Sequence, residues 1–303
     1  MPEQIAGTLT FLGTGTSMGV PALACSCPVC TSTNPRDKRL RPSILLRWPS
    51  SSPSSSPSNS ENNALIDTGP DFRTQALRAN IQRVDAVFYT HSHADHILGM
   101  DDLRPLSFVT HHESGPIPLY VTAETRSVLE RIFDYTFSSH SKYPHRARVE
   151  LKEIQSDPGL IHSGVLVDNL RITPIPVLHG DLPITGYRFG NTAYLTDVST
   201  IPEPSFGLLE GLETLIVSAL RHTPHPSHAT VKQAVAWAER IGAKQTWFTH
   251  ISHDLGHEET NATLPAGMSL AWDTLTIPFA ATSESSKIAL ESAPKLGPES
   301  AKP

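Results

Sequence analysis

The sequence predicts an α/β fold in which β-sheets are covered by helices. Strand hairpins come first along the chain, and strands alternate with helical segments later. A third observation is that several apolar runs end at an acidic or imidazole side chain, namely Asp67, His91, His179, Asp197 and His250. Strand ends that gather on one edge of a sheet make a site, so we expect these side chains to meet.

Apolar patterning predicts the individual elements. Strands are expected at 8–12, 43–48 and 63–69, and the Ser/Pro-rich insert 49–62 has little to bury and is expected to be disordered. Segment 71–81 has helical spacing, with Phe72, Ala76, Leu77 and Ile81 on one face. Further strands are expected at 83–90, 170–180, 192–200, 214–220 and 245–250, and further helices at 127–137 and 230–242.

Composition excludes several classes of protein. The chain has 303 residues and a formal net charge of −6, which argues against a general nucleic-acid binder. It has no run of about 18 apolar residues that could span a membrane, and its start lacks the pattern of a secretory signal. We expect a cytoplasmic protein with one domain over 1–282 and a disordered tail at 283–303. A homodimer is compatible with the sequence.

The stretch THSHADH places His91, His93, Asp95 and His96 within six positions. A single histidine is more often an ordinary surface or core residue than a ligand. Burying three imidazoles with a carboxylate, however, requires a compensating charge. The motif therefore predicts a metal site, for which zinc suits the donors best and manganese or iron are alternatives.

THSHADH resembles the motif of the metallo-β-lactamase superfamily, and PVLHG, LTDVS and FTHISH follow it in the expected order. The resemblance covers roughly residues 7–280 and implies a four-layer αββα sandwich with metal at the edge of its two sheets. It further implies that His91, His93 and His179 hold a first metal, that Asp95, His96 and His250 hold a second, and that Asp197 bridges them.

Two metals at this edge favour one substrate class. Two divalent ions about 3.5–4 Å apart can share a hydroxide that attacks a phosphorus centre. The charges of two such cations exceed the combined negative charge of Asp95, Asp197 and the hydroxide. The site therefore keeps a net positive charge, which suits a small anionic phosphodiester. Thioesters and lactones, the substrates of other branches of the superfamily, would also be activated.

The motif CSCPVC contains Cys25, Cys27 and Cys30, which are all the cysteines of the chain. They could be three inert thiols or ligands of an iron–sulfur cluster. Their tight spacing favours a metal, and a tetrahedral zinc would need a fourth ligand, for which histidine is the natural candidate.

GTGTSMGVPALACSCPVC resembles the start of the phosphoribosyl 1,2-cyclic phosphate phosphodiesterase family. That resemblance implies a structural zinc held by the three cysteines and by His253, with His257 as the alternative. Such a zinc would join the N-terminal loop to the strand that carries His250. The glycines of this stretch do not match a nucleotide-binding fingerprint and are expected in tight turns.

The remaining candidates lie near these motifs. His228 matches a histidine that relatives place beside the metals, where it would contact a phosphate oxygen or protonate the leaving group, and Arg221 could add charge. We therefore expect His228 and Asp197 to be the catalytic residues. Asp67 is expected to accept a hydrogen bond from a ligand histidine, or else to be a turn residue. Ser218 stands where the family pattern leads us to expect a carboxylate.

The sequence therefore predicts a phosphodiesterase with two active-site metals, zinc or manganese, and one structural zinc. Its expected substrate is a small, cyclic phosphodiester. An alternative is an RNA-processing nuclease that resembles tRNase Z, but the motif HAT at 228–230 lacks the glutamate of those enzymes, and no basic arm is present. A thioester or lactone hydrolase is a further alternative, and a metal-carrying scaffold without activity is disfavoured by the intact ligand set.

Overall fold

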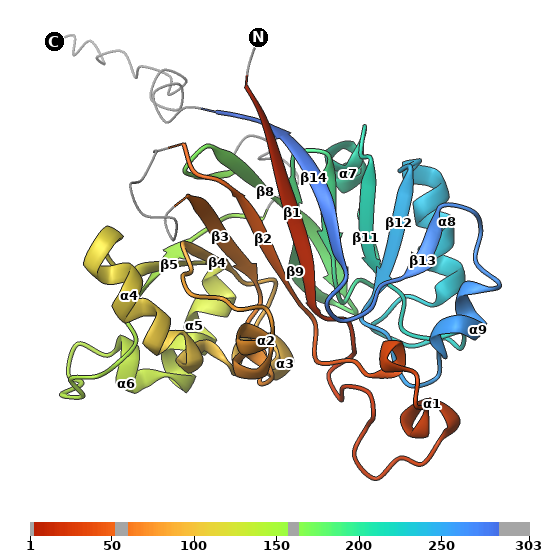
Figure 1. Ribbon diagram of the computed structural model, residues 1–303, viewed down its shortest axis with the longest axis horizontal. Helices are drawn as coiled ribbons and strands as arrows, with labels where there is room; N and C mark the ends of the chain where they lie inside the picture. Colours follow the sequence, from red (N-terminus) through yellow and green to blue (C-terminus); the bar gives the residue numbers. More distant parts are fainter. Residues whose placement is uncertain (1–2, 52–59, 157–163, 285–303) are drawn as a thin grey trace, which may run out of the picture.

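Two seven-stranded sheets pack face to face, and helices cover both outer surfaces (Figure 1). The computed structural model describes residues 3–51, 60–156 and 164–284. The predicted four-layer αββα sandwich is confirmed. Most of the insert 49–62 and of the tail 283–303 lies outside the described residues, although Glu61 and Asn62 already belong to a strand and Glu284 forms an ion pair with Arg171.

The first sheet joins the two ends of the described chain. Its antiparallel part runs from β14 through β1 and β2 to β3, and its parallel part continues through β4 and β5 to β6. The strands are β1 (Gln4–Gly13), β2 (Ser43–Pro49), β3 (Glu61–Ile66), β4 (Ala86–Phe88), β5 (Ile117–Val121), β6 (Val149–Glu153) and β14 (Thr276–Thr282).

The second sheet has the same plan. An antiparallel meander of β7, β8, β9 and β10 continues into parallel pairing of β10, β11, β12 and β13. The strands are β7 (Val165–Val167), β8 (Leu170–His179), β9 (Leu182–Phe189), β10 (Thr192–Leu195), β11 (Thr214–Ser218), β12 (Gln245–Thr249) and β13 (Met268–Leu270).

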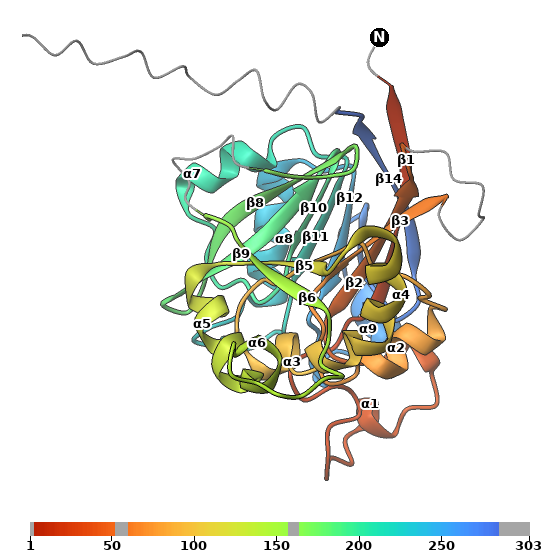
Figure 2. The same ribbon diagram turned by 90° about the vertical axis from the view of Figure 1, so that its left-hand side faces the viewer.

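Helices flank the sandwich on both sides, as Figure 2 shows from a second direction. α2, α4 and α5 pack on the first sheet, and α7 and α8 pack on the second. None of the helices in the described ranges has the length and hydropathy to span a lipid bilayer. The α-helices are α1 (Pro28–Thr31), α2 (Phe72–Arg78), α3 (Ala94–Ile97), α4 (Arg104–Ser114), α5 (Ala123–Ile132), α6 (Asp134–Phe137), α7 (Glu203–Phe206), α8 (Val231–Ile241) and α9 (His257–Asn261), with 3-10 turns at Pro35–Asp37, Met100–Leu103 and Gly207–Leu209.

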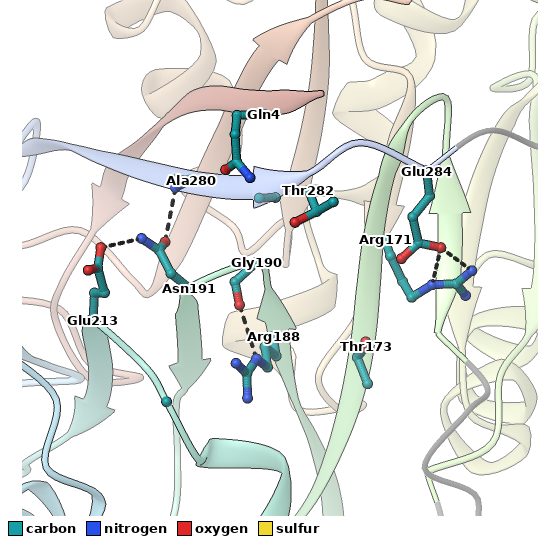
Figure 3. A pocket seen from close by; sticks show the side chains of 12 residues that line it. Gln4, Arg171, Thr173, Arg188, Gly190, Asn191, Glu213, Ala280, Thr282 and Glu284 are labelled. Carbon is teal, nitrogen blue, oxygen red and sulfur yellow. Dashed lines mark hydrogen bonds and ion pairs between the residues drawn. The ribbon is translucent and has the colours of Figure 1, made fainter. Parts of the chain in front are cut away.

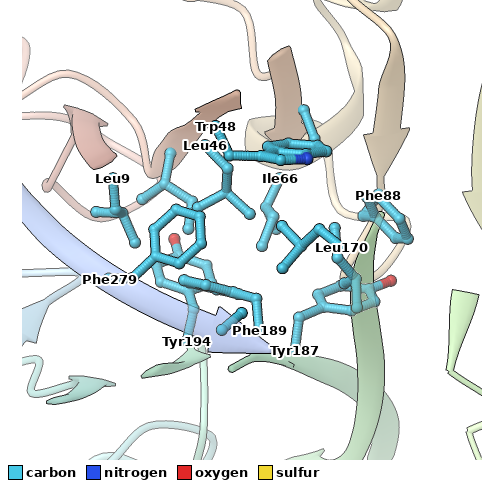
Figure 4. Packing of buried hydrophobic residues seen from close by; sticks show 14 of the residues in the cluster. Leu9, Leu46, Trp48, Ile66, Phe88, Leu170, Tyr187, Phe189, Tyr194 and Phe279 are labelled. Carbon is cyan, nitrogen blue, oxygen red and sulfur yellow. The ribbon is translucent and has the colours of Figure 1, made fainter. Parts of the chain in front are cut away.

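The main core lies between the two sheets (Figure 4). Large side chains of the first sheet, such as Trp48 and Phe88, face aromatic rings of the second, such as Tyr187 and Phe189. The Phe88 and Tyr187 rings meet edge to face, with centroids 5.4 Å apart. Because this packing fixes the two sheets relative to each other, it also fixes the strand ends that carry the candidate site.

Two helices test the sequence predictions directly. α8 begins with a capping box between Thr230 and Gln233 and ends at Gly242, whose φ of 72° only glycine adopts readily, so the predicted helix 230–242 is confirmed. In α2, the expected burial of Leu77 is wrong, because its side chain is 66% exposed. Gln75 is buried instead, since its side-chain amide donates to the carbonyl oxygen of Arg41 at 2.8 Å.

Candidate metal centres

Strand ends deliver the candidate ligands to one edge of the sandwich, as the sequence predicts. Asp67 directly follows β3, and His91 comes three residues after the end of β4. On the second sheet, His179 ends β8, Asp197 follows β10 and His250 follows β12. The carboxyl ends of neighbouring parallel strands lie together, so residues far apart in the sequence meet beside α3, at the lower edge in Figure 1.

The first group of donors contains His91, His93 and His179, whose ligand atoms lie within 4.8 Å of one another. Nδ1 of His179 contacts the carbonyl oxygen of Ser227 at 2.7 Å, so it carries the proton and leaves Nε2 unprotonated. Nδ1 of His91 lies 3.0 Å from Oγ1 of Thr90. His93 is exposed, and the group is therefore open to solvent on that side.

The second group of donors contains Asp95, His96, Asp197 and His250, all of them buried. Nδ1 of His96 donates to a carboxylate oxygen of Asp67 at 2.7 Å. Its Nε2 consequently faces the group, 3.2 Å from oxygens of both Asp95 and Asp197. The expected role of Asp67 as the acceptor that orients a candidate ligand histidine agrees with this geometry.

Asp197 lies between the two groups. One of its oxygens is 3.0 Å from Nε2 of His250, and its ligand atoms also cluster within 4.8 Å of those of His179 and His228. The hydroxyl of Thr196 donates to its other oxygen at 2.7 Å. This is the position that a bridging carboxylate requires.

Unsatisfied atoms show that the two groups fit a pair of cations. Nε2 of His91, His96 and His250 is buried without a hydrogen bond within the described chain, although oxygens of Asp197 lie close to two of them. Buried polar atoms rarely lack partners. Imidazole nitrogens and carboxylate oxygens that converge on two points are donors suited to zinc or manganese.

The pKa values reflect the same concentration of negative charge. Burial lowers the pKa of His250, but the charges and hydrogen bonds of Asp197 and Asp95 together outweigh burial and raise that pKa to about 9. The pKa of His96 is likewise raised well above its usual value, where burial is outweighed by Asp95 and Asp197. Protons thus balance the buried carboxylates in the metal-free protein, and divalent cations would replace them.

The backbone has an uncommon conformation where it presents these residues. Asp67, Asp197 and His250 have φ values of 65°, 58° and 54°, in the left-handed region that few residues other than glycine adopt and that Asp and His enter more often than most. Gly69 permits a further close approach, because a Cβ atom there would lie 2.0 Å from the carbonyl oxygen of Asp95. The turns after β3, β10 and β12 therefore hold the ligands in fixed directions.

His228 lies beside the second group. Its ring stacks on that of His250 at 4.8 Å, and its buried Nδ1 has no hydrogen-bond partner in the described chain. Burial, followed by the charge of His250, lowers the pKa of His228 to about 3. The ring is therefore neutral at pH 7, with one nitrogen that can donate a hydrogen bond and one that can accept a hydrogen bond.

Arg221 and Ser218 have structural roles that the sequence did not reveal. Arg221 donates to the carbonyl oxygens of Thr223 and Pro224 and so holds its own loop. Ser218, found where a carboxylate was expected, accepts a hydrogen bond from the backbone N–H of Val198 at 2.9 Å. The serine therefore fixes the backbone directly after Asp197.

The three cysteines form a separate cluster with His253. Nδ1 of His253 lies 3.1, 3.6 and 3.4 Å from the sulfur atoms of Cys25, Cys27 and Cys30, respectively. A hydrogen bond from the Cys30 backbone lowers the pKa of Cys27 to about 7 and so favours its thiolate. Three thiols and one imidazole fit a tetrahedral zinc. His257 points elsewhere, toward the guanidinium of Arg39 at 3.2 Å.

The glycine-bearing loop after β1 also contacts the site. Gly15 pairs with Ile251, and backbone bonds of 3.2 and 2.9 Å join Ile251 to Thr16 and Thr14. The N-terminal loop therefore contacts two residues that follow the candidate ligand His250: Ile251 through backbone hydrogen bonds, and His253 through the cysteine sulfur atoms. Sequence reasoning missed one further residue, Thr90, which donates to Asp67 and contacts His91.

Comparisons with known proteins agree with this architecture. A family model described as a beta-lactamase superfamily domain matches residues 62–251. The crystal structure of "a new diphosphatase from the PhnP family" superposes with a TM-score of 0.81 at 46% identity and covers 92% of this chain and 100% of that chain. The short form of human tRNase Z superposes with a TM-score of 0.62 at 19% identity, covers 89% of this chain and 98% of that chain, and shows the shared fold.

Two curated relatives carry different names. A Porphyromonas gingivalis protein named octanoyltransferase is 37% identical over 270 residues, which are 88% of this chain and 50% of that protein. This chain therefore spans about half the length of that relative. A ribonuclease Z from Mycobacterium marinum is 27% identical over 215 residues, which are 61% of this chain and 75% of the relative.

Proposed function

We propose, on the premise that this chain belongs to the beta-lactamase superfamily and to its PhnP-like branch, that it is a metal-dependent hydrolase of small phosphodiesters. One observation carries the proposal: Asp197 belongs to the second donor group, and its carboxylate also lies within 4.8 Å of the ligand atom of His179 in the first group. The 46% identical neighbour, named a diphosphatase, supports chemistry at a phosphoryl group.

The proposed assignment of the groups follows their geometry. His91, His93 and His179 would hold one divalent cation, Asp95, His96 and His250 would hold the other, and Asp197 would contact both. Zinc or manganese at these positions would supply Lewis-acid stabilisation of phosphoryl oxygens and a nucleophile at neutral pH. Asp67 and Ser227 keep His96 and His179 in the tautomer that leaves Nε2 free. A third ion, a zinc on the cysteine cluster, would be structural.

His228 is the proposed contact for substrate. Its unpartnered Nδ1 and its position next to Asp197 and His250 support this role, in which a neutral imidazole would lie beside the reacting phosphoryl group. A hydrogen bond to a phosphoryl or leaving-group oxygen fits the lowered pKa of His228 better than transfer of a stored proton does.

The alternatives are less well supported. The ribonuclease Z relatives are 28% identical or less, and Ala229 stands directly after His228, where tRNase Z has a glutamate. The name octanoyltransferase applies to a protein of which this chain matches half, so it gives no reason to propose acyl transfer. A diphosphate is a second candidate substrate, because the neighbour with 46% identity is named a diphosphatase.

The test is an activity screen of the metal-loaded protein. Bis-p-nitrophenyl phosphate and cyclic ribose phosphates should be hydrolysed with zinc or manganese, and a diphosphate ester and a glutathione thioester should be compared with them. Asp197→Ala should abolish turnover, whereas Asp85→Asn, which changes a half-buried carboxyl away from the metal edge, should retain it. Absence of turnover on every diester, with bound metal verified, would overturn the proposal. Light scattering would test the homodimer, which stays a prediction.

A further inference from the structure

The loop between β11 and α8 borders the metal edge and has little regular structure. A bridge between Arg221 and Thr230 closes it at its base. Between these two residues, positions 222–228 of the described chain form no hydrogen bond from backbone to backbone. Side chains hold them instead, and Arg221 donates to the carbonyl oxygens of Thr223 and Pro224. The shape of the loop therefore depends on a few side-chain contacts.

Ser227 is the residue of this loop that contacts a candidate ligand. Its carbonyl oxygen lies 2.7 Å from Nδ1 of His179 and accepts the hydrogen bond of that ring. The loop also packs closely on the end of β8, because a Cβ atom added to Gly180 would lie 3.3 Å from Cβ of Ser227. The carbonyl of Ser227 must keep its direction if the proton of His179 is to stay on Nδ1 and leave Nε2 free.

A second histidine, His225, contacts the backbone of Ser227. The N–H of Ser227 donates to Nδ1 of His225 at 3.3 Å, and the hydroxyl of Ser227 lies 3.3 Å from the same nitrogen. A backbone N–H can only donate, so Nδ1 is the unprotonated nitrogen of a neutral His225 ring. Both backbone polar groups of Ser227 are thus bonded to imidazoles, the N–H to His225 and the C=O to His179.

The other nitrogen of His225 offers a competing role. The ring is half-buried and lies against His228, with centroids 4.9 Å apart. All hydrogen bonds of this side chain to described residues are made by Nδ1, so the N–H of Nε2 has no partner there. That N–H could contact substrate, and a test must therefore separate the two nitrogens. His222, on the same loop, is exposed and serves as a control.

We infer that His225 is a positioning residue, which holds Ser227 and so keeps His179 in the tautomer that presents Nε2 to a cation. The inference rests on the proposed function only in taking His179 as a ligand, and it requires no particular substrate. Loss of one neutral hydrogen bond should lower the affinity of the first donor group for zinc about 2–10-fold. A group bonded directly to a ligand histidine commonly contributes more, about 10–100-fold.

The first measurement is the tautomer of His179 in the metal-free protein, from NMR of isotope-labelled imidazole rings at about pH 8, above the ordinary histidine pKa of about 6.5. The His179→Gln spectrum identifies its signals. His225→Leu removes the acceptor and should give a mixture of the two tautomers. His225→Asn should restore the Nδ1–H form, because its amide oxygen can occupy the place of Nδ1. His225→Gln, whose amide reaches the place of Nε2, should not restore it.

The second measurement is the zinc content of the loaded protein in buffers of graded chelator strength. His225→Leu and His225→Gln should lose zinc from the first group at about 2–10-fold lower chelator strength than the wild type, and His225→Asn should not. Two controls should also match the wild type. His222→Leu alters the same loop. Asn191→Leu removes a side-chain acceptor of a backbone N–H, that of Ala280 at 2.9 Å, in a cavity of about 530 Å³ at the other end of β8 (Figure 3).

The outcomes distinguish this inference from the proposed function. An unchanged His179 tautomer in His225→Leu would overturn the inference, even if zinc affinity fell. Zinc affinity retained by His225→Gln but lost by His225→Asn would also overturn it, because the effect would then come from Nε2. If His225→Leu did not fold, the contrast between the asparagine and glutamine variants would still decide. A wild type that hydrolysed no diester would refute the proposed function and leave both measurements valid.

Discussion

Replacing Asp67 by asparagine should weaken cation binding at the second donor group while the chain stays folded. Oδ1 of Asp67 now accepts a hydrogen bond of 2.8 Å from the backbone N–H of Thr90. The amide oxygen of the new side chain can keep this bond. Its amide N–H₂ would then face Nδ1 of His96, from which Oδ2 of Asp67 now accepts a hydrogen bond of 2.7 Å. His96 would respond by carrying its proton on Nε2, the atom that faces Asp95 and Asp197.

The magnitude follows from the loss of one ligand's orientation. Substitutions of such supporting groups commonly lower metal affinity 10–100-fold, which corresponds to about 1.4–2.8 kcal/mol at about 1.4 kcal/mol per tenfold change. The packing change is small, because asparagine and aspartate have nearly the same shape. We therefore expect the free energy of unfolding of the metal-free chain to change less than its affinity for metal.

The assay is metal content per chain after dialysis against buffers of graded chelator strength. Asp85→Asn is the matched control, because Asp85 also accepts hydrogen bonds from a backbone N–H and a side chain, at 2.8 and 2.7 Å, but away from the edge. Circular dichroism checks the fold of both variants. If Asp67→Asn retained its metals as tightly as Asp85→Asn, the proposed orientation of His96 would be refuted.

Three further changes have defined outcomes. Cys30→Ser should release one zinc per chain and lower the thermal midpoint, since structural zinc contributes about 10 kcal/mol or more in small domains; elemental analysis with thermal unfolding measures both. Ser218→Ala leaves the N–H of Val198 without its side-chain acceptor, and urea unfolding should show a loss of about 1–3 kcal/mol. Burial, then the charge of Arg39, lowers the pKa of His257 to about 4, below about 6.5 in unfolded chains. Between these pH values the unfolded chain binds one more proton, so stability should fall by up to about 3 kcal/mol as the pH drops from 6.5 to 4. His257→Gln should lack this part of the pH dependence, and an unchanged slope in urea unfolding would contradict the assignment.

Much of the fold could be predicted because its central elements are strongly patterned. α8 has a capping residue, an apolar face and a terminal glycine, and its boundaries follow the prediction closely. β14 was not predicted, because Pro278 and the two alanines in TIPFAAT obscure the alternation of buried and exposed positions. Its partner β1 lies more than 260 positions earlier in the chain, and such non-local pairing leaves no local signal.

The candidate ligands were found in the sequence because histidine and aspartate are uncommon at the ends of buried strands. Their supporting contacts could not be found in this way. Thr90 and Ser218 have ordinary residue types, and their hydrogen bonds to Asp67 and Val198 depend on turns that only the folded backbone defines. The burial of Gln75 has the same cause, since its partner is a backbone carbonyl of a distant loop.

The pairing of β1 with β14 has a consequence for biosynthesis. A ribosome makes β1 first, but the strand that covers its open edge is complete only at Thr282. For most of translation, the nascent polypeptide therefore exposes an unpaired strand edge. Such an edge is a template for association between nascent chains. His253 likewise reaches the cysteines late. We expect yield in a cell to depend on chaperones and translation speed more than the stability of the finished molecule suggests.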